Sequence, residues 1–132
     1  MRLVDTSAWI EWLTDSPTGQ AISPLIPAQA DWLTPTMVQL ELAKWLAREL
    51  DEDRADQVIA FSQLCQVVPL DTEIALSAAE ICARHGLATA DAIIYATALA
   101  READLLTCDA HFAGLAGVRY VAKRIGGAPE GA

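Results

Sequence analysis

The stretch TADAIIYATALAREA, residues 89–103, is the feature that most restricts how this chain can fold. Its spacing predicts a helix that Thr89 caps at its N-terminus. Apolar side chains occupy nearly every face of that helix, so it must be buried on most sides. The chain therefore needs a layered fold that encloses a helix.

Short strand-like runs alternate with helical patterns along the remaining sequence. This alternation predicts a mainly parallel sheet of about five short strands, covered by helices on both faces, in a three-layer α/β/α domain. The expected strands cover residues 2–4, 31–35, 66–71, 104–109 and 118–122. The first expected helix holds residues 9–13, and a loop follows over 14–19. A helix or pair of turns covers 20–29 and is interrupted by Pro24 and Pro27. Further helices are expected over 37–50 (capped by Thr36), 51–65, 71–86 (ending at Gly86) and 89–103.

Length and composition favour one globular domain. The 132 residues, 53% of them hydrophobic, can bury a substantial core. We expect a single domain over residues 1–125 and a flexible tail over 126–132. No stretch approaches the ~20 apolar residues of a membrane-spanning helix, and the N-terminus lacks a signal-peptide pattern, so we expect a cytoplasmic protein.

Charge and cysteine usage exclude some functions. The three widely spaced cysteines, Cys65, Cys82 and Cys108, form neither a disulfide framework nor a zinc pattern, and we expect reduced, buried thiols. With only His85 and His111, a histidine metal site or a Cys–His dyad has little support. A net charge of −9 repels a polyanion, which any nucleic-acid function must accommodate.

Two acids follow predicted strands. Asp5 ends the run RLV and Asp109 ends the run LLTC. Ligands of open parallel sheets bind beyond the carboxyl ends of the strands, where the strand order reverses. If the two strands are neighbours, the two carboxylates share one site; the alternative is that both acids cap turns or helices.

Glu41 lies within the helix predicted over 37–50, at the edge of its apolar stripe. The simplest interpretation is a boundary residue that pairs with Lys44 at i,i+3. Lys44 and Arg48 follow Glu41 on one ridge of the helix, so they are candidates to contact substrate phosphates; the alternative is a solvated face.

Asp91 occupies the first turn of the apolar helix, where a carboxylate complements the helix dipole. A buried acid without a nearby Lys or Arg nevertheless requires a counterion. Four acids, Asp5, Glu41, Asp91 and Asp109, offer only oxygen ligands, which suit Mg²⁺ or Mn²⁺. The hydroxyls of Ser7 and Thr107 are expected to orient waters or carboxylates there, or else to serve as ordinary turn hydroxyls.

Four blocks of the sequence, LVDTSAWIEWL, ELAKW, ATADAIIYATALA and LLTCDAHFAGL, resemble the acidic motifs of PIN-domain ribonucleases, in the same order and spacing. The compact size and the position of the first motif resemble the VapC toxins of bacterial and archaeal toxin–antitoxin pairs. The resemblance covers nearly the whole chain. Cys108 is a departure, because family members often carry a basic or polar residue there.

The resemblance implies a PIN-like fold with the first and fourth strands adjacent. It also implies an Mg²⁺- or Mn²⁺-dependent endoribonuclease that hydrolyses RNA through a metal-activated water, with Asp5, Glu41, Asp91 and Asp109 as catalytic residues and metal ligands. A homodimer and a cognate antitoxin whose tail covers the site are implied as well.

Two other functions remain open at this stage. A phospho-acceptor receiver domain would use Asp5, Asp71, Thr107 and Lys123, but Thr6 stands where that fold expects a second acid, and three of the four acids above stay unexplained. A catalytically silent PIN-like interaction module is the second alternative.

Overall fold

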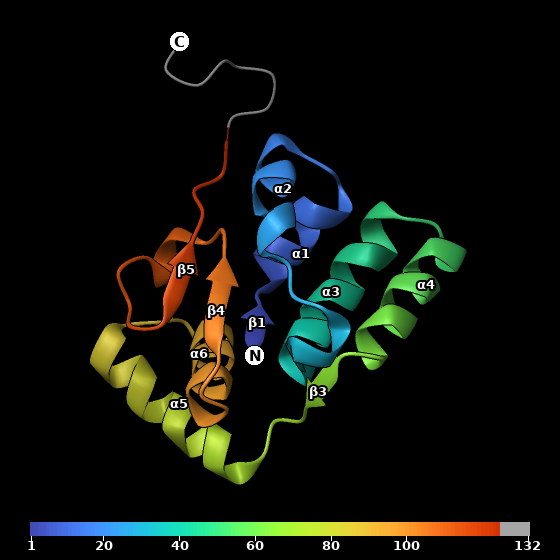
Figure 1. Ribbon diagram of the computed structural model, residues 1–132. Coiled ribbons are helices and arrows are strands. Elements are labelled where there is room, and N and C mark those ends of the chain that lie inside the picture. Colours follow the sequence, from blue (N-terminus) through green and yellow to red (C-terminus); the bar gives the residue numbers. More distant parts are fainter. Residues whose placement is uncertain (125–132) are drawn as a thin grey trace.

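Five parallel strands form the central sheet, in the spatial order β3-β2-β1-β4-β5 (Figure 1). The computed structural model describes residues 1–124. All four strand pairings are parallel, which confirms the predicted sheet, although several strands are shorter than expected. The strands are β1 (Arg2–Val4), β2 (Trp32–Pro35), β3 (Gln66–Val68), β4 (Asp104–Thr107) and β5 (Val118–Tyr120).

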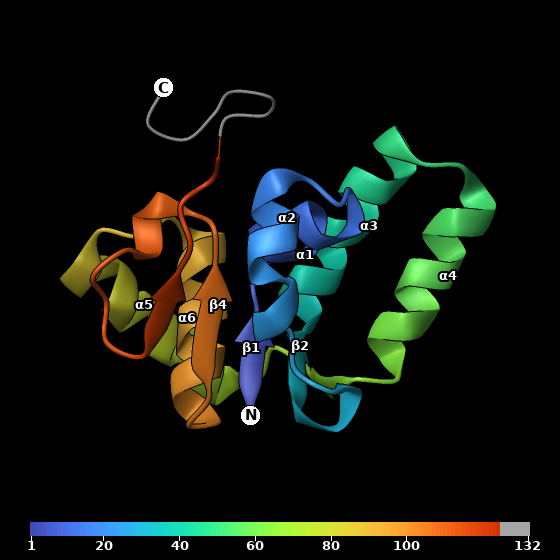
Figure 2. The same cartoon turned by 45° about the horizontal axis from the view of Figure 1, so that its top comes forward.

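Helices cover both faces of this sheet. Figure 2 shows α1 to α4 gathered on one side and α5 with α6 on the other, which confirms the three-layer α/β/α fold. The α-helices are α1 (Thr6–Leu13), α2 (Pro17–Ile22), α3 (Thr36–Glu49), α4 (Glu52–Gln63), α5 (Thr72–His85) and α6 (Thr89–Ala100). Three short 3-10 helices are η1 (Ser23–Leu25), η2 (Gln29–Asp31) and η3 (Ala110–Phe112).

The direction in which the sheet grows reverses between β1 and β4. The chain builds outward from β1 to β3 and then returns to the other side of β1. Arg2 and Asp104 are paired in register and joined by two hydrogen bonds of 3.0 and 2.9 Å. At the opposite end, the Asp5 N–H donates to the Leu106 carbonyl at 2.9 Å. This register places the residues after β1 and β4 side by side.

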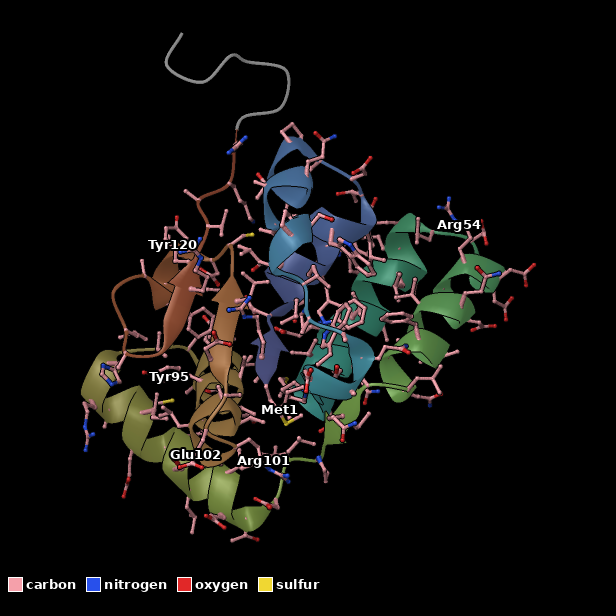
Figure 3. The ribbon with its side chains drawn as sticks, in the orientation of Figure 1. Met1, Arg54, Tyr95, Arg101, Glu102 and Tyr120 are labelled. Carbon is pink, nitrogen blue, oxygen red and sulfur yellow. The ribbon has the colours of Figure 1, made fainter. Side chains whose placement is uncertain are left out.

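Helix α6 is the buried helix that the sequence predicts. Residues 92–98 are all buried, and the helix packs against α5, α3 and β4. The Tyr95 hydroxyl donates to the Ala116 carbonyl at 2.7 Å, which ties the helix to the turn before β5 (Figure 3). The burial fixes the position of the first turn of α6 at the rim of the sheet.

Four aromatic rings hold α1, β2 and α4 together. Trp9, Trp12, Trp32 and Phe61 contact one another with ring centroids 4.5–6.0 Å apart. Such a cluster buries a large apolar area and adds favourable edge-to-face contacts. It fixes the orientation of α1, whose first turn carries the residues that follow Asp5.

One of two local predictions between α1 and β2 is wrong and the other is confirmed. The predicted loop over 14–19 contains the start of α2, because the Ser16 side chain accepts a hydrogen bond from the Gly19 N–H at 2.9 Å and caps a helix there. The predicted interruption of the segment over 20–29 at Pro24 is confirmed: α2 ends at Ile22 and the separate 3-10 helix η1 covers Ser23–Leu25, since proline interrupts the helix ladder.

Two predicted caps are also wrong. The N-cap of α3 is Pro35, and the Thr36 hydroxyl instead accepts from the Leu70 N–H at 3.2 Å. The N-cap of α6 is Ala88, which makes no side-chain cap. The predicted stop at Gly86 is confirmed, with a left-handed φ of 67°.

Other expectations concern the cysteines, the membrane and the tail. Cys65 and Cys108 are buried as predicted, Cys82 is half-buried, and all three are free thiols. No helix within residues 1–124 is long and apolar enough to cross a membrane. The predicted tail, residues 126–132, lies outside the described residues.

We expect Gly19→Ala to destabilise the protein. A Cβ at this position would lie 1.9 Å from the Glu11 carbonyl oxygen of α1, so the two helices must separate, at a cost of about 1–3 kcal/mol. Helix propensity alone predicts the opposite sign, a gain of up to about 1 kcal/mol. Urea denaturation measures the free energy of unfolding, with Gln20→Ala as an exposed control in the same helix. A more stable Gly19→Ala protein would contradict this prediction.

Candidate functional site

Asp5 lies directly after β1 and is only 4% exposed. It occupies the N-cap position of α1, yet its side chain makes no cap hydrogen bond. Its Oδ2 instead accepts from the Ser7 hydroxyl at 2.7 Å and from the Thr107 hydroxyl at 2.8 Å. Asp5 is therefore a buried carboxylate held by hydroxyls, and the capping alternative is wrong for this residue.

The same two hydroxyls connect the ends of β1 and β4. Ser7 Oγ accepts from the Cys108 N–H at 3.0 Å, and Thr107 Oγ1 accepts from the Asp109 N–H at 3.0 Å. The two hydroxyl oxygens are 3.3 Å apart. The network holds the backbone that carries Asp109 next to Asp5.

Glu41 enters the site from α3. Its Oε1 accepts from the Thr6 hydroxyl at 2.7 Å. The described ion pairs do not include the predicted pair with Lys44. Burial raises the pKa of Asp5, hydrogen bonds from Ser7 and Thr107 lower it, and the negative charge of Glu41 raises it further.

Asp91 is the third residue of α6 and has a side chain 20% exposed. Burial raises the pKa of this carboxyl to about 6, and the charges of Asp109, Asp5 and Glu41 contribute in that order. The charge of His111 acts in the opposite direction. These mutual influences show that acids from four separate segments share one site.

Asp109 follows β4 and caps η3, because its Oδ1 accepts from the His111 N–H at 2.9 Å. The capping alternative is therefore correct for Asp109, although its carboxylate also faces the other acids. The Nδ1 atom of His111 lies 2.8 Å from Asp109 Oδ1 and 4.0 Å from Asp91 Oδ2. One ligand atom from each of these three residues lies within 4.8 Å of the others.

The donor set at this cluster fits a divalent cation. Within residues 1–124 the lysine and arginine ion pairs are Arg2–Asp104 and Arg48–Glu49, and neither touches the four acids. Carboxylates that raise one another's pKa are relieved by a hard cation, which they bind through oxygen. The structure thus brings together Asp5, Glu41, Asp91 and Asp109, with Ser7 and Thr107 in support.

Lys44 and Arg48, the predicted phosphate contacts, form no ion pair with these acids in the described residues. Lys44 is exposed on α3, and Arg48, which is 68% exposed, pairs with its neighbour Glu49 at 3.0 Å. Two residues at this cluster were not predicted to belong to it: Thr6, which donates to Glu41, and His111, for which a histidine metal site had little support. Thr6 directly follows Asp5, and His111 lies two residues beyond Asp109, so proximity to the acids was the available signal.

An open groove of about 460 Å³ begins at the cluster. Tyr120 of β5, which is labelled in Figure 3, is one of the residues that line it. The pKa of the Cys108 thiol is raised to about 11, mainly by burial and then by the charge of Glu11, while the charge of Lys123 acts against this rise. The thiol is thus protonated and is no nucleophile at neutral pH. The groove is lined by Ser7, Cys108, Asp109, Ala110, Tyr120, Ala122 and Lys123.

The model of the PIN domain family matches residues 2–118. The chain belongs to the PIN domain family. No curated protein matches the chain. The family assignment agrees with the parallel sheet and with the adjacency of β1 and β4.

Solved structures share the PIN fold. A toxin–antitoxin complex from Klebsiella pneumoniae is 20% identical, with a TM-score of 0.78, and the match covers 90% of this chain and 96% of that chain. FitAcB from Neisseria gonorrhoeae is 24% identical, with a TM-score of 0.68, over 83% of this chain and 88% of that chain. VapC20 from Mycobacterium tuberculosis, a sarcin–ricin loop cleaving toxin, is 21% identical, with a TM-score of 0.69, over 90% and 99%. At these identities the likeness concerns the fold.

We expect Asp91→Asn to stabilise the PIN domain in the presence of a chelator. The pKa of Asp91 is raised from 3.8 to about 6 in the folded protein. The proton on Asp91 therefore stabilises the folded wild type fully below about pH 4, and this stabilisation is lost as the pH rises through about 6. At about pH 7.5 the free energy of unfolding should be about 1–2 kcal/mol higher for the variant than for the wild type. That figure lies below the full value of the shift, because the side chain is 20% exposed.

Urea denaturation in chelator at about pH 7.5 and about pH 4 measures this effect, and the difference should shrink at the lower pH. Asp56→Asn, on the exposed face of α4, is the control. A variant that is less stable at both pH values would instead favour a structural role at the start of α6.

Proposed function

We propose that this protein is a divalent-metal-dependent endoribonuclease and the toxin of a toxin–antitoxin pair. The observation that carries the proposal is the convergence of Asp5, Glu41, Asp91 and Asp109 on one rim, with no lysine or arginine paired to them in the described residues. Membership of the PIN family and the structural likeness to VapC20, a toxin that cleaves the sarcin–ricin loop, support it.

The four acids would hold Mg²⁺ or Mn²⁺. When bound, such a cation lowers the pKa of a water and stabilises negative charge on a phosphodiester during hydrolysis. Asp91 and Asp109 each offer a carboxylate oxygen within 4.8 Å of the other. We assign Asp5 and Glu41 to complete the set or to position the attacking water.

The surrounding hydroxyls have a positioning role in this proposal. Ser7 and Thr107 each donate to Asp5 Oδ2, so both bonds end on one oxygen of the carboxylate. Thr6 donates to Glu41 Oε1. Fixed carboxylates need less rearrangement when they bind a cation or orient a water, which is the advantage of a preorganised site.

The groove from Asp109 to Lys123 provides a path for RNA beside the acids. Lys123 lines this path. Its charge acts on Cys108, the position where related proteins often carry a basic or polar residue. Tyr120, 36% exposed, offers a ring on which a base could stack. Lys44 and Arg48 remain proposed contacts for phosphates farther along the substrate.

The net charge of −9 suits a regulated enzyme that binds RNA weakly outside its site. A cognate antitoxin would need basic residues to cover the acidic rim, and similar solved structures are toxin–antitoxin complexes. We propose such an antitoxin as the partner, together with a homodimer and a cytoplasmic location.

The receiver-like alternative gains no support from the geometry. It requires Asp71 as the phospho-acceptor, yet the Asp71 side chain caps α5 by accepting from the Ile74 N–H at 2.9 Å. A catalytically silent module remains distinguishable by the cleavage assay below.

We expect Asp91→Asn to lower the rate of RNA cleavage by about 100-fold or more, because a direct ligand should matter at least as much as an outer-shell partner. Chelator should abolish wild-type cleavage, and added Mg²⁺ or Mn²⁺ should restore it. Cleavage of a generic single-stranded RNA by the purified chain measures both effects, and Asp56→Asn serves as the folded control. Chelator-resistant cleavage, or a variant with the wild-type rate, would contradict the proposal.

We expect Lys123→Ala to weaken RNA binding and to reduce its salt dependence. Loss of one phosphate contact should lower the slope of log K against log salt by about 0.7 for a single strand. Fluorescence anisotropy with RNA, in chelator to prevent cleavage, measures the slope. Lys44→Ala is the matched comparison: if it lowers the slope while Lys123→Ala does not, the RNA path runs along α3 rather than through the groove.

A further inference from the structure

His111 lies at the acid cluster but has no part in the mechanism above. It belongs to η3, and the next residue, Phe112, is fully buried. This anchor, together with the hydrogen bond from the His111 N–H to Asp109 Oδ1, fixes the backbone of the turn. The imidazole itself is 78% exposed, so the ring can adjust around a fixed Cα.

The position of the imidazole nitrogen matches that of a ligand. Nδ1 lies 2.8 Å from Asp109 Oδ1 and 4.0 Å from Asp91 Oδ2. An octahedral cation with bonds of about 2.1 Å separates adjacent ligands by about 3.0 Å and opposite ligands by about 4.2 Å. The three ligand atoms, all within 4.8 Å of one another, need only small side-chain shifts to surround such a cation.

We propose that His111 Nδ1 is a ligand of the divalent cation, next to Asp91 and Asp109, and that it makes the centre prefer Mn²⁺ to Mg²⁺. The inference rests on the proposed function, because it assumes that the acids bind a cation. It changes the expected ligand set from oxygen alone to a mixture of oxygen and nitrogen.

Charge and ligand chemistry both favour this assignment. A neutral imidazole adds a donor to the site without adding negative charge to four acids that already repel one another. Imidazole nitrogen is a good ligand for transition metals, whereas Mg²⁺ strongly prefers oxygen. A nitrogen ligand should therefore contribute to Mn²⁺ affinity and little to Mg²⁺ affinity.

The competing interpretation is that His111 is a counterion. A protonated imidazole paired with Asp109 would occupy the place of the cation and compete with it. The two interpretations predict opposite effects of removing the ring: loss of a ligand weakens Mn²⁺ binding, whereas loss of a counterion strengthens binding of both metals.

The test is metal binding by the full chain, measured by calorimetry with Mn²⁺ and with Mg²⁺. We compare the wild type with His111→Ala and with His111→Gln, which retains a polar side chain of similar reach but lacks the ring nitrogen. His85→Ala, an exposed histidine on α5, is the matched control. Pulsed EPR of the Mn²⁺-loaded chains gives a direct readout, since a coordinated imidazole nitrogen couples to the metal electron spin.

We expect His111→Ala to weaken Mn²⁺ binding about tenfold or more and Mg²⁺ binding by less than about twofold. Nitrogen coupling should appear in the wild type and in His85→Ala and be lost in both His111 variants. Equal changes for the two metals, tighter binding, or a wild type without nitrogen coupling would overturn the ligand role. If the ligand role of His111 fails but Asp91→Asn abolishes Mn²⁺ binding, the proposed metal centre still stands. If the wild type binds neither Mn²⁺ nor Mg²⁺, both the ligand role and the proposed function are rejected.

Discussion

The parallel pairing of β1 with β4 is the constraint on which the site depends. Arg2 and Asp104 lock the register at one end of the two strands. At the other end the same register brings Asp5 beside Thr107, whose hydroxyl donates to the buried carboxylate. Because both strands are central, neither can slip without exposing a whole apolar face. The rim is therefore a consequence of how the middle of the sheet is assembled.

Burial of acids at this rim works against folding in the cation-free protein. Asp5 is almost fully enclosed, and Asp91 has a pKa raised to about 6 by burial and by its acidic neighbours. Hydroxyl donors relieve part of the cost for Asp5. Burial of the large apolar core around α6 and of the aromatic cluster around Trp9 offsets the rest of the free-energy cost of burying these acids. A site that is electrostatically unfavourable when empty is well suited to bind a cation tightly, since binding removes the repulsion.

Much of the fold was predictable because local patterns specify it. The apolar helix over 89–100, the helix stop at Gly86 and the alternation of strands and helices all follow from side-chain periodicity and turn chemistry. Predictions based on capping preference were less reliable. Asp5, Thr36 and Thr89 all lie at or beside the start of a helix, yet none of their side chains caps it. Asp5 and Thr36 form hydrogen bonds with groups on other segments instead. At the start of α6 the cap position is occupied by Ala88, the residue before Thr89. Tertiary contacts override local preference wherever a better partner lies nearby.

The sequence alone determined which residues carry charge in each segment: four acids at the ends of strands and in helices, with no lysine or arginine near Asp91 in the sequence. It also determined the layered architecture, through the apolar faces that must be covered. Only the tertiary structure decided that Thr6 holds Glu41, that Ser7 and Thr107 share Asp5, and that His111 joins Asp91 and Asp109. These contacts join segments up to about a hundred residues apart. The register of a sheet, not the order of the chain, sets such distances.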